Sequence, residues 1–259
     1  MPSETKDLLA FVIPSYRRPE ECMKRTVSLL AKHGIKPTVY LSDPSETKAY
    51  EEAAQKHGLE GRVEIAPGKL GLSQNRNHIR KCHPEGSYLV CLDDDVKGIQ
   101  RLAADGKKLV DVDLQELFKE THAFCQSREV TLWGGYPVAN GFFMSNRVRF
   151  GNYFIYGSFF MEQVSHDPKF DLREDFSGSR EDIERTLIHG DYGLVSRFEF
   201  ITHRSDYRKL DGGLQALGRG DDDEHLDWIF SNWGHKTLEK RRTDGSREVK
   251  LLTKPGQGQ

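Results

Sequence analysis

Three consecutive carboxylates, Asp93-Asp94-Asp95, come directly after five strand-prone residues, 88–92. An apolar run of this length indicates a strand buried in a parallel sheet. The acids would then lie at the carboxyl edge of the sheet, where open α/β sheets bind their ligands. Neighbouring carboxylates repel one another, and a divalent cation with oxygen ligands is a common way to hold them together. The alternative is a solvated acidic turn.

A second acid pair, Glu181-Asp182, precedes a helix-like segment, residues 183–189, that ends at Gly190. A carboxylate held at the start of a helix and facing a cleft is well placed to accept a proton. The alternative is that Asp182 only supports the helix terminus, because Ser179 and Asp182 have the spacing of a capping pair. A third cluster of acids, residues 221–224, precedes an amphipathic run and is interpreted as the first turn of a helix.

The remaining features are less specific. His203 follows an expected strand at residues 195–201 and could be a metal ligand or an ordinary surface histidine. The glycines form neither a GxGxxG fingerprint nor a Walker loop, which argues against a Rossmann dinucleotide site and a P-loop.

The elements that must position these residues are βα units. Apolar runs at residues 8–13, 38–41, 63–65 and 88–92 alternate with helical patterns, in which Ser45 and Ser73 are expected to cap two of the helices. Four such units in about a hundred residues predict a parallel sheet with right-handed crossovers. Polar residues follow three of the strands, and their common edge could hold a nucleotide.

The second half of the chain is less regular. It suggests a hairpin at residues 98–111, an amphipathic helix at 114–126, and an aromatic, glycine-rich region at 133–160 that could form cleft walls or ordinary antiparallel strands. Residues 236–250 are basic and strand-like. We predict a single domain over residues 1–259, with a nucleotide-sugar-binding half at 8–100, an acceptor-binding half at 101–253 and a flexible tail at 254–259.

Composition sets the broad class. The 259 residues are 36% hydrophobic, which is enough for an α/β domain with a real core. The formal net charge of -2 gives no global basic field, although a local patch could still bind nucleic acid. Four cysteines without a CxxC pair fit reduced thiols, and the first apolar run is too short to span a membrane. We therefore expect a soluble cytoplasmic protein without a membrane partner.

Four segments stand in a specific order and spacing along the chain. They are Ile13-Pro14-Ser15-Tyr16-Arg17-Arg18, Gly71 with Asn75-Arg76-Asn77, Asp93-x-Asp95, and Arg180-Glu181-Asp182. Together they resemble the glycosyltransferases of the GT-A fold. The fold implied is α/β, a single Rossmann-like mixed sheet flanked by helices, with a DXD motif at the C-terminal strand edge. More narrowly, the chain is similar to the TET-associated glycosyltransferases of phages, relatives of the enzyme that glucosylates base J. The narrower likeness rests on Leu41-Ser42-Asp43-Pro44, Tyr50 and Gly212-Gly213, and the whole resemblance covers residues 11–217.

The resemblance implies a role for each matching residue. Asp182, with Glu181 as runner-up, would be the base of an inverting transfer. Asp95, Asp93 and His203 would hold a divalent metal, Mn²⁺ or Mg²⁺. The donor would be a UDP-sugar, UDP-glucose or UDP-N-acetylglucosamine. The residues implied in donor binding are Pro14, Ser15, Tyr16, Arg17, Asp43, Arg76, Asp93 and Asp94.

The subfamily implies an acceptor as well, the hydroxyl of a 5-hydroxymethylpyrimidine in DNA, with 5-hydroxymethylcytosine favoured. If the protein is encoded by a phage, it would act in the host cytoplasm. Basic residues for phosphate contact are available, and each could equally be a solvated surface charge. These are Arg147, Arg149, Arg204, Arg208, Lys209 and Lys240-Arg241-Arg242.

Two other functions stay open at this point. A GT-A enzyme could act on a glycan, lipid carrier or small metabolite, and a GT-A domain could serve as a catalytically silent binding module. A nucleotidyltransferase also uses paired acids on a parallel sheet, but the segment after the first strand lacks the usual Gly-rich phosphate loop. The sugar, the choice of metal and the oligomeric state are not determined by these patterns.

Overall fold

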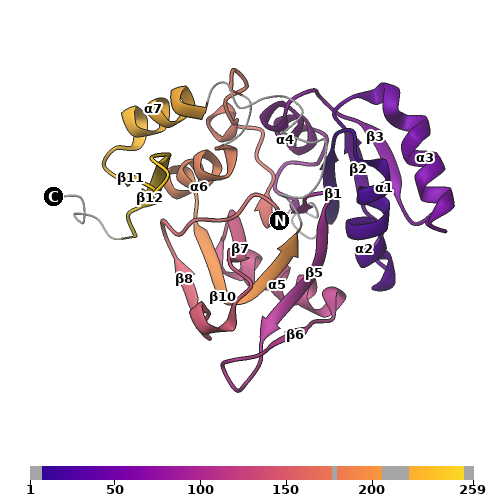
Figure 1. The fold of residues 1–259 in the computed structure, drawn as a ribbon, viewed down its shortest axis with the longest axis horizontal. Coiled ribbons are helices and arrows are strands. Elements are labelled where there is room, and N and C mark those ends of the chain that lie inside the picture. Colours follow the sequence, from indigo (N-terminus) through magenta and orange to yellow (C-terminus); the bar gives the residue numbers. More distant parts are fainter. Residues whose placement is uncertain (1–7, 177–179, 206–221, 254–259) are drawn as a thin grey trace, which may run out of the picture.

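The computed structural model describes residues 8–176, 180–205 and 222–253 (Figure 1). Several sequence predictions concern residues outside these ranges. They are the Ser179 cap, the basic residues Arg208 and Lys209, Gly212-Gly213, and the tail at 254–259.

A ten-stranded mixed sheet forms the centre of the molecule, in the order β3-β2-β1-β4-β9-β7-β10-β5-β6, with β8 paired to β10. Strands β3, β2, β1 and β4 are mutually parallel, as the βα pattern predicts. Their carboxyl ends meet at one edge. The bounds are β1 Leu9–Ser15, β2 Thr38–Leu41, β3 Glu64–Pro67 and β4 Tyr88–Leu92.

The second half of the sheet is largely antiparallel. Strand β9 joins the two halves by pairing with both β4 and β7. Strand β10 runs parallel to β7 and antiparallel to β5 and β8. It continues through Ser205, so His203 lies within the strand and not after it as predicted. The bounds are β5 Val96–Leu102, β6 Leu109–Asp111, β7 Leu132–Tyr136, β8 Val148–Phe150, β9 Phe159–Gln163 and β10 Val195–Ser205.

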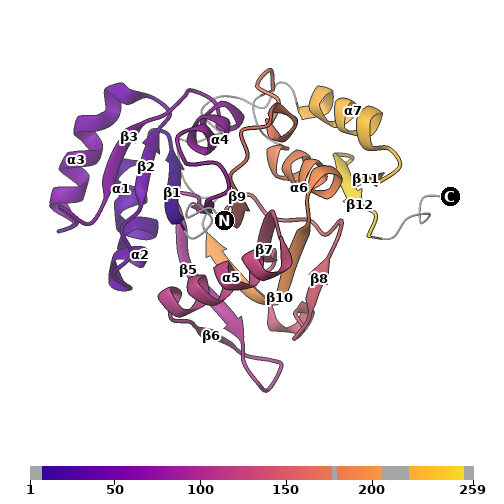
Figure 2. The same ribbon diagram turned by 180° about the vertical axis from the view of Figure 1, so that it is seen from behind.

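Helices cover both faces of the sheet. The core on one face includes side chains from α1, the π-helical turn η2, α2, α3 and α5, while α4 contributes Ile79 to the other face. In Figure 2, which shows the molecule from the side opposite to Figure 1, α5 lies in front of β5 and β10. The bounds are α1 Pro19–Cys22, η2 Met23–Val27, α2 Ser28–Lys32, α3 Thr47–Lys56, α4 Leu72–Lys81, α5 Leu114–Arg128, α6 Glu181–Tyr192 and α7 Asp222–Trp233.

Two predicted helix caps are wrong. Asp43, and not Ser45, caps the short 3₁₀ turn η3, Pro44–Glu46, by accepting a hydrogen bond from the Ser45 backbone N–H. Gly71 is the N-cap of α4, and Ser73 lies inside the helix with its hydroxyl buried and without a hydrogen-bond partner. Gly71 has φ +97°, a backbone conformation that glycine adopts readily. The start of α4 is therefore set by the backbone conformation at Gly71 and not by a side-chain cap.

The C-terminal part is a smaller layer over α6. Helix α7 and the hairpin β11 Thr237–Arg241 with β12 Arg247–Leu251 pack on α6 around Leu187, Ile229 and Trp233. Figure 1 shows this layer beside α6. No helix in the described part of the chain has the length and apolar character needed to cross a membrane. All four cysteines are free thiols, as predicted.

Candidate active site

The three aspartates after β4 have three different environments. They lie where the carboxyl ends of β1 and β4 meet, because these strands are parallel neighbours. Asp94 and Asp95 are buried, while the side chain of Asp93 keeps 27% of its surface exposed. The contacts therefore separate Asp94, which is held by neighbouring protein groups, from Asp93 and Asp95, which are the candidates for ligand binding.

Asp94 is held by neighbouring protein groups. Its Oδ1 lies 3.2 Å from Nη1 of Arg18, and its Oδ2 accepts a hydrogen bond of 2.6 Å from the hydroxyl of Ser15. Ser15 in turn lies 2.7 Å from the hydroxyl of buried Tyr50. Burial raises the pKa of Asp94, while Arg18 and the Ser15 bond oppose that rise. This arrangement does not support the prediction that Asp94 contacts the donor.

We expect Asp94→Asn to lower the free energy of unfolding by about 3–5 kcal/mol, the usual cost of removing one partner of a buried ion pair. The loss follows from leaving the Arg18 guanidinium buried without its carboxylate. Urea denaturation at neutral pH measures it. Replacing both partners, Arg18→Met with Asp94→Leu, should recover part of the loss, and a double variant as unstable as Asp94→Asn would contradict this account.

Asp95 is in the opposite situation. Only 1% of its surface is exposed, and both carboxylate oxygens lack a hydrogen-bond partner. Burial, together with the charges of Asp93 and Asp94, raises the pKa of Asp95 to about 7. A buried carboxylate without partners is costly, so these two oxygens mark a place where a cation would be stabilised.

Arg76 links the DXD segment to the second acid pair. Its Nη2 lies 3.0 Å from Oδ1 of Asp93 and donates to the carbonyl of Gly157 at 2.9 Å, and its Nε lies 3.3 Å from Oε1 of Glu181. The side chain is buried, and the neighbouring acids raise the pKa of its guanidinium. Arg76 therefore positions two acids of the site, whatever it contacts on a donor.

The two acids at the start of α6 also differ in their partners. Glu181 is buried between Arg76 and Arg185, whose Nη1 lies 2.6 Å from its Oε2. Asp182 has no such partner among the contacts described: its oxygens accept only backbone N–H bonds, from Ile183 at 2.9 Å and Gly157 at 3.4 Å. Burial, then the charge of Glu181, raises the pKa of Asp182 to about 6. Asp182 is the better candidate base of the two.

His203 lies on β10 beside the loop that precedes β9. Its Nε2 is 2.5 Å from the hydroxyl of Ser158, and its ring stacks on Tyr156 with a centroid distance of 5.6 Å. Burial lowers the pKa of His203 to about 4, so the imidazole is neutral at neutral pH, the form that binds metals. Because Nε2 is already occupied by Ser158, only Nδ1 is left for a ligand.

The other predicted donor residues line the ends of β1 and β2. Pro14 and Ser15 are buried, Tyr16 is partly exposed, and Arg17 is exposed with φ +55° and its guanidinium 4.9 Å from the Tyr16 ring centroid. Asp43 is partly exposed and its carboxylate is used at least in part by the η3 turn. Tyr16, Arg17 and Asp43 thus remain accessible to a ligand, whereas Ser15 serves mainly to hold Asp94.

Asp93 and Asp95 could hold a divalent ion whose remaining ligands come from the substrate. Within residues 8–176, 180–205 and 222–253, no three His, Cys, Asp or Glu side chains are grouped closely enough to hold a metal ion alone. Mg²⁺ is commonly bound through one or two carboxylates together with substrate phosphates. The unpartnered oxygens of Asp95 and the partly exposed Asp93 match that arrangement.

The contacts of several site residues were not predicted. Arg18 belongs to a segment that carries the resemblance, and Gly157 and Ser158 belong to the predicted cleft walls. Their contacts with the acids, like those of Arg185, depend on packing and follow from no motif spacing. Gly157 sits so close to Glu181 that an added Cβ would lie 2.6 Å from Oε1, so this position needs glycine. The predicted cleft walls divide accordingly: Gly157 and Ser158 reach the site, whereas Phe159 and Phe160 are core.

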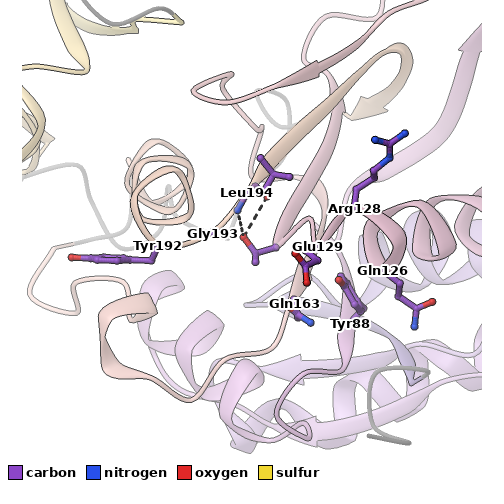
Figure 3. Close-up of a pocket in the computed structure, with 9 residues that line it drawn as sticks. Tyr88, Gln126, Arg128, Glu129, Gln163, Tyr192, Gly193 and Leu194 are labelled. Carbon is purple, nitrogen blue, oxygen red and sulfur yellow. Dashed lines mark hydrogen bonds between the residues drawn. The ribbon is translucent and has the colours of Figure 1, made fainter. Parts of the chain in front are cut away.

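A hollow of about 410 Å³ lies at the opposite edge of the sheet (Figure 3). It is bounded by the start of β4 at Tyr88, by Thr131 before β7 and by Leu194 before β10. The DXD segment and the acid pair are not among its walls. It is therefore separate from the candidate active site.

Comparisons with known proteins support the fold. No family model matches the chain, and no curated protein does. The solved structure of S. aureus TarS 1-349 matches with a TM-score of 0.51 and 14% sequence identity, over 74% of this chain and 58% of that one. A second S. aureus TarS structure matches with a TM-score of 0.48 and 14% identity, over 73% of this chain and 34% of that one. The chain spans a little over half the length of TarS 1-349.

TarS has a GT-A-like fold, and the match establishes a fold of this kind for this chain. The predicted fold class, a mixed α/β sheet flanked by helices, is confirmed.

Proposed function

We propose that this protein is an inverting glycosyltransferase that uses a UDP-sugar and a divalent metal. The observation that carries the proposal is the bridge formed by Arg76 between Asp93 and Glu181. This bridge places the DXD segment and the acid helix α6 around the same buried guanidinium, on a GT-A-like fold.

The chain's own residues divide the work of the reaction. Asp182 accepts the proton of the acceptor hydroxyl as that oxygen attacks the anomeric carbon, and the sugar inverts its configuration because attack and departure occur on opposite faces. General-base help of this kind typically contributes about 10²–10⁴ in rate. Glu181 cannot take this role as readily, because Arg76 and Arg185 already compensate its charge.

The donor end is formed by the DXD segment and the ends of β1 and β2. Asp95 and Asp93 would hold the metal, and His203 could add a ligand through Nδ1. The metal supplies Lewis-acid stabilisation of the leaving diphosphate. Tyr16, Arg17 and Asp43 are exposed enough to contact the base and ribose.

For the acceptor we propose the hydroxyl of 5-hydroxymethylcytosine in DNA, as the resemblance to the TET-associated enzymes implies. In duplex DNA the 5-position of a pyrimidine faces the major groove and can be reached without unpairing. An enzyme that acts on an unpaired base instead takes it from a single strand or flips it out of the duplex, at a cost of a few kcal/mol. Arg147 and Arg204 are exposed and could contact phosphates. Arg149 is partly buried and lies 3.3 Å from Glu199, so it is a weaker candidate than predicted.

The rate of transfer should fall as the pH is lowered through about 6. Only the deprotonated form of Asp182 accepts a proton, and its pKa is raised to about 6, so about half is active at pH 6 and about a tenth at pH 5. Above pH 7.5 Asp182 is almost fully deprotonated, so its titration should no longer change the rate. Rates at saturating substrates across pH 5–8 measure this, and a rate independent of pH below 6 would contradict the assignment of Asp182.

Release of UDP across a panel of acceptors tests the function. We expect release from UDP-glucose or UDP-N-acetylglucosamine to require Mn²⁺ or Mg²⁺ and to increase when 5-hydroxymethylcytosine DNA is added, compared with unmodified DNA of the same sequence. Stimulation by saccharides alone would keep the glycosyltransferase proposal and remove the DNA acceptor. No release under any condition would favour a silent binding module.

A further inference from the structure

An exposed apolar patch lies on the loops beside β5 and β8. We define it by Val138, Phe142 and Phe143, whose exposed fractions are 50%, 84% and 58%. The two phenylalanines belong to the 3₁₀ turn η4, Gly141–Phe143, and their rings meet edge to face with centroids 5.1 Å apart. Two adjacent phenylalanines so fully exposed are unusual on a soluble domain and indicate a binding surface.

The patch lies on the same face of the sheet as the acid helix. An added Cβ at Gly141 would lie 3.3 Å from the side chain of Leu102 on β5, and Gly98 of β5 is paired with Arg204, whose Nη2 lies 3.4 Å from the corresponding Cβ position. Gly98 and Leu102 point to one face because side chains alternate along a strand. Ile99 points to the other face, into the core with α5. The turn η4 and Arg204 therefore share the face opposite α5.

This face leads from the patch to the site. Leu102 lies four positions after Gly98 along β5, a rise of about 13 Å. Arg204 is exposed on this face, whereas its neighbour His203, paired with Ile99, points to the other. The acid helix α6 packs on the face opposite α5, because the guanidinium of Arg185 lies 3.6 Å from the ring centroid of Phe160 in that core. A strand of nucleic acid with its reacting base beside α6 could therefore place a base a few nucleotides away over η4.

Positive charge surrounds the patch. The hairpin tip that joins β5 to β6 contacts η4 through the Lys107 carbonyl beside Gly141, and it carries exposed Lys107 and Lys108. Arg147 follows η4 and is also exposed. Asp105 is the carboxylate at the same tip, and it accepts hydrogen bonds from the backbone N–H groups of the two lysines. Figures 1 and 2 show this hairpin and the start of β8 at the same end of the molecule.

We propose that the patch binds unpaired bases of the acceptor strand, with Phe142 and Phe143 stacking on bases and Lys107, Lys108 and Arg147 contacting phosphates. Aromatic side chains beside a basic track are the usual means of binding single-stranded nucleic acid, because every base offers a π face. The inference rests on the proposed DNA acceptor and adds where the strand lies and which residues hold it.

Fluorescence anisotropy of a labelled single-stranded oligonucleotide of about 12 nucleotides tests the proposal. The double variant Phe142→Ala with Phe143→Ala should bind at least about tenfold more weakly than the wild type, in keeping with the usual effect of removing base stacking. Tyr192→Ala is the matched control, because it removes an aromatic side chain that is 53% exposed beside the hollow at the other edge of the sheet. It should bind like the wild type.

A second variant examines the charges. Lys107→Gln with Lys108→Gln should reduce the slope of log affinity against log salt by about 0.7 for each phosphate of the single strand that the variant no longer binds. An unchanged slope would place the phosphates elsewhere and overturn the assigned role of the lysines. Because all the substituted side chains are exposed, unchanged thermal unfolding should accompany each variant.

The remaining outcomes are also decisive. Equal affinity of the phenylalanine variant and the wild type, or no binding by either, would overturn the inference. So would binding to phosphatidylserine vesicles that is lost in the phenylalanine variant while oligonucleotide binding is kept, since the patch would then be a lipid-binding surface. Phenylalanine-dependent binding without any sugar transfer to 5-hydroxymethylcytosine DNA would support the docking surface and overturn the acceptor proposed above.

Discussion

Asp182→Asn is expected to lower the rate of sugar transfer by about 10²–10⁴ while leaving the affinity for the UDP-sugar unchanged. Asparagine keeps the shape of the side chain, and its Oδ1 can still accept the backbone hydrogen bond of Ile183, while only the longer bond from Gly157 is lost. It cannot take the acceptor's proton. Single-turnover transfer measures the rate, and calorimetric titration of UDP with Mn²⁺ measures donor binding.

Two comparisons make the Asp182 result specific. Asp113→Asn makes the same chemical change at the N-cap of α5, outside the site, where asparagine caps equally well, so transfer should be normal. Glu181→Gln should disturb the ion pairs with Arg76 and Arg185 and lower stability. Normal turnover in Asp182→Asn, or a full loss only in Glu181→Gln, would transfer the role of base to Glu181.

Asp95→Asn should lower metal-dependent transfer by about 10³ or more, because a catalytic cation contributes several kcal/mol and each 1.4 kcal/mol is a factor of ten. The same substitution should stabilise the metal-free protein, since it removes a buried charge that has no partner. Each kcal/mol gained corresponds to about 2–4 °C in Tm for a chain of this size. Thermal unfolding with and without Mn²⁺ measures both effects.

The neighbouring acid provides the control for Asp95. Asp94→Asn should destabilise the protein, because the buried Arg18 guanidinium loses the Asp94 carboxylate, so adjacent substitutions are expected to change Tm in opposite directions. In Asp95→Asn the rise in Tm caused by Mn²⁺ should disappear. A lower Tm for metal-free Asp95→Asn, or an unchanged response to Mn²⁺, would contradict the assignment of Asp95 as the metal-binding acid.

The parallel half of the sheet could be predicted because its strands are short apolar runs closed by turn residues. The strand of residues 88–92 is buried along its whole length, and that burial is what its composition indicates. The antiparallel half was harder to predict. Strand β10 extends beyond its apolar part through Thr202 and His203, because β5 and β7 supply hydrogen-bonding partners on both sides. Such pairing depends on distant segments and leaves no local periodicity.

The acids of the site could be predicted from the sequence, whereas the ion pairs that its arginines form with those acids could not. Asp93, Asp95 and Asp182 stand next to elements that the pattern reveals, whereas the buried roles of Arg18, Arg76 and Arg185 depend on how helices pack on the sheet. Three adjacent aspartates look equivalent in sequence. Only the contacts distinguish Asp94, neutralised by Arg18, from Asp95, left without a partner.

Mass spectrometry of nucleosides from 5-hydroxymethylcytosine DNA, incubated with the protein, Mn²⁺ and UDP-glucose or UDP-N-acetylglucosamine, tests directly whether the protein transfers sugar to DNA. We expect a gain of one hexose or one N-acetylhexosamine on the modified cytosine, greatly reduced in Asp95→Asn and in Asp182→Asn. No gain on modified DNA, combined with metal-dependent transfer to a saccharide or small molecule, would contradict the DNA acceptor. A gain of full size in both variants would contradict the site itself.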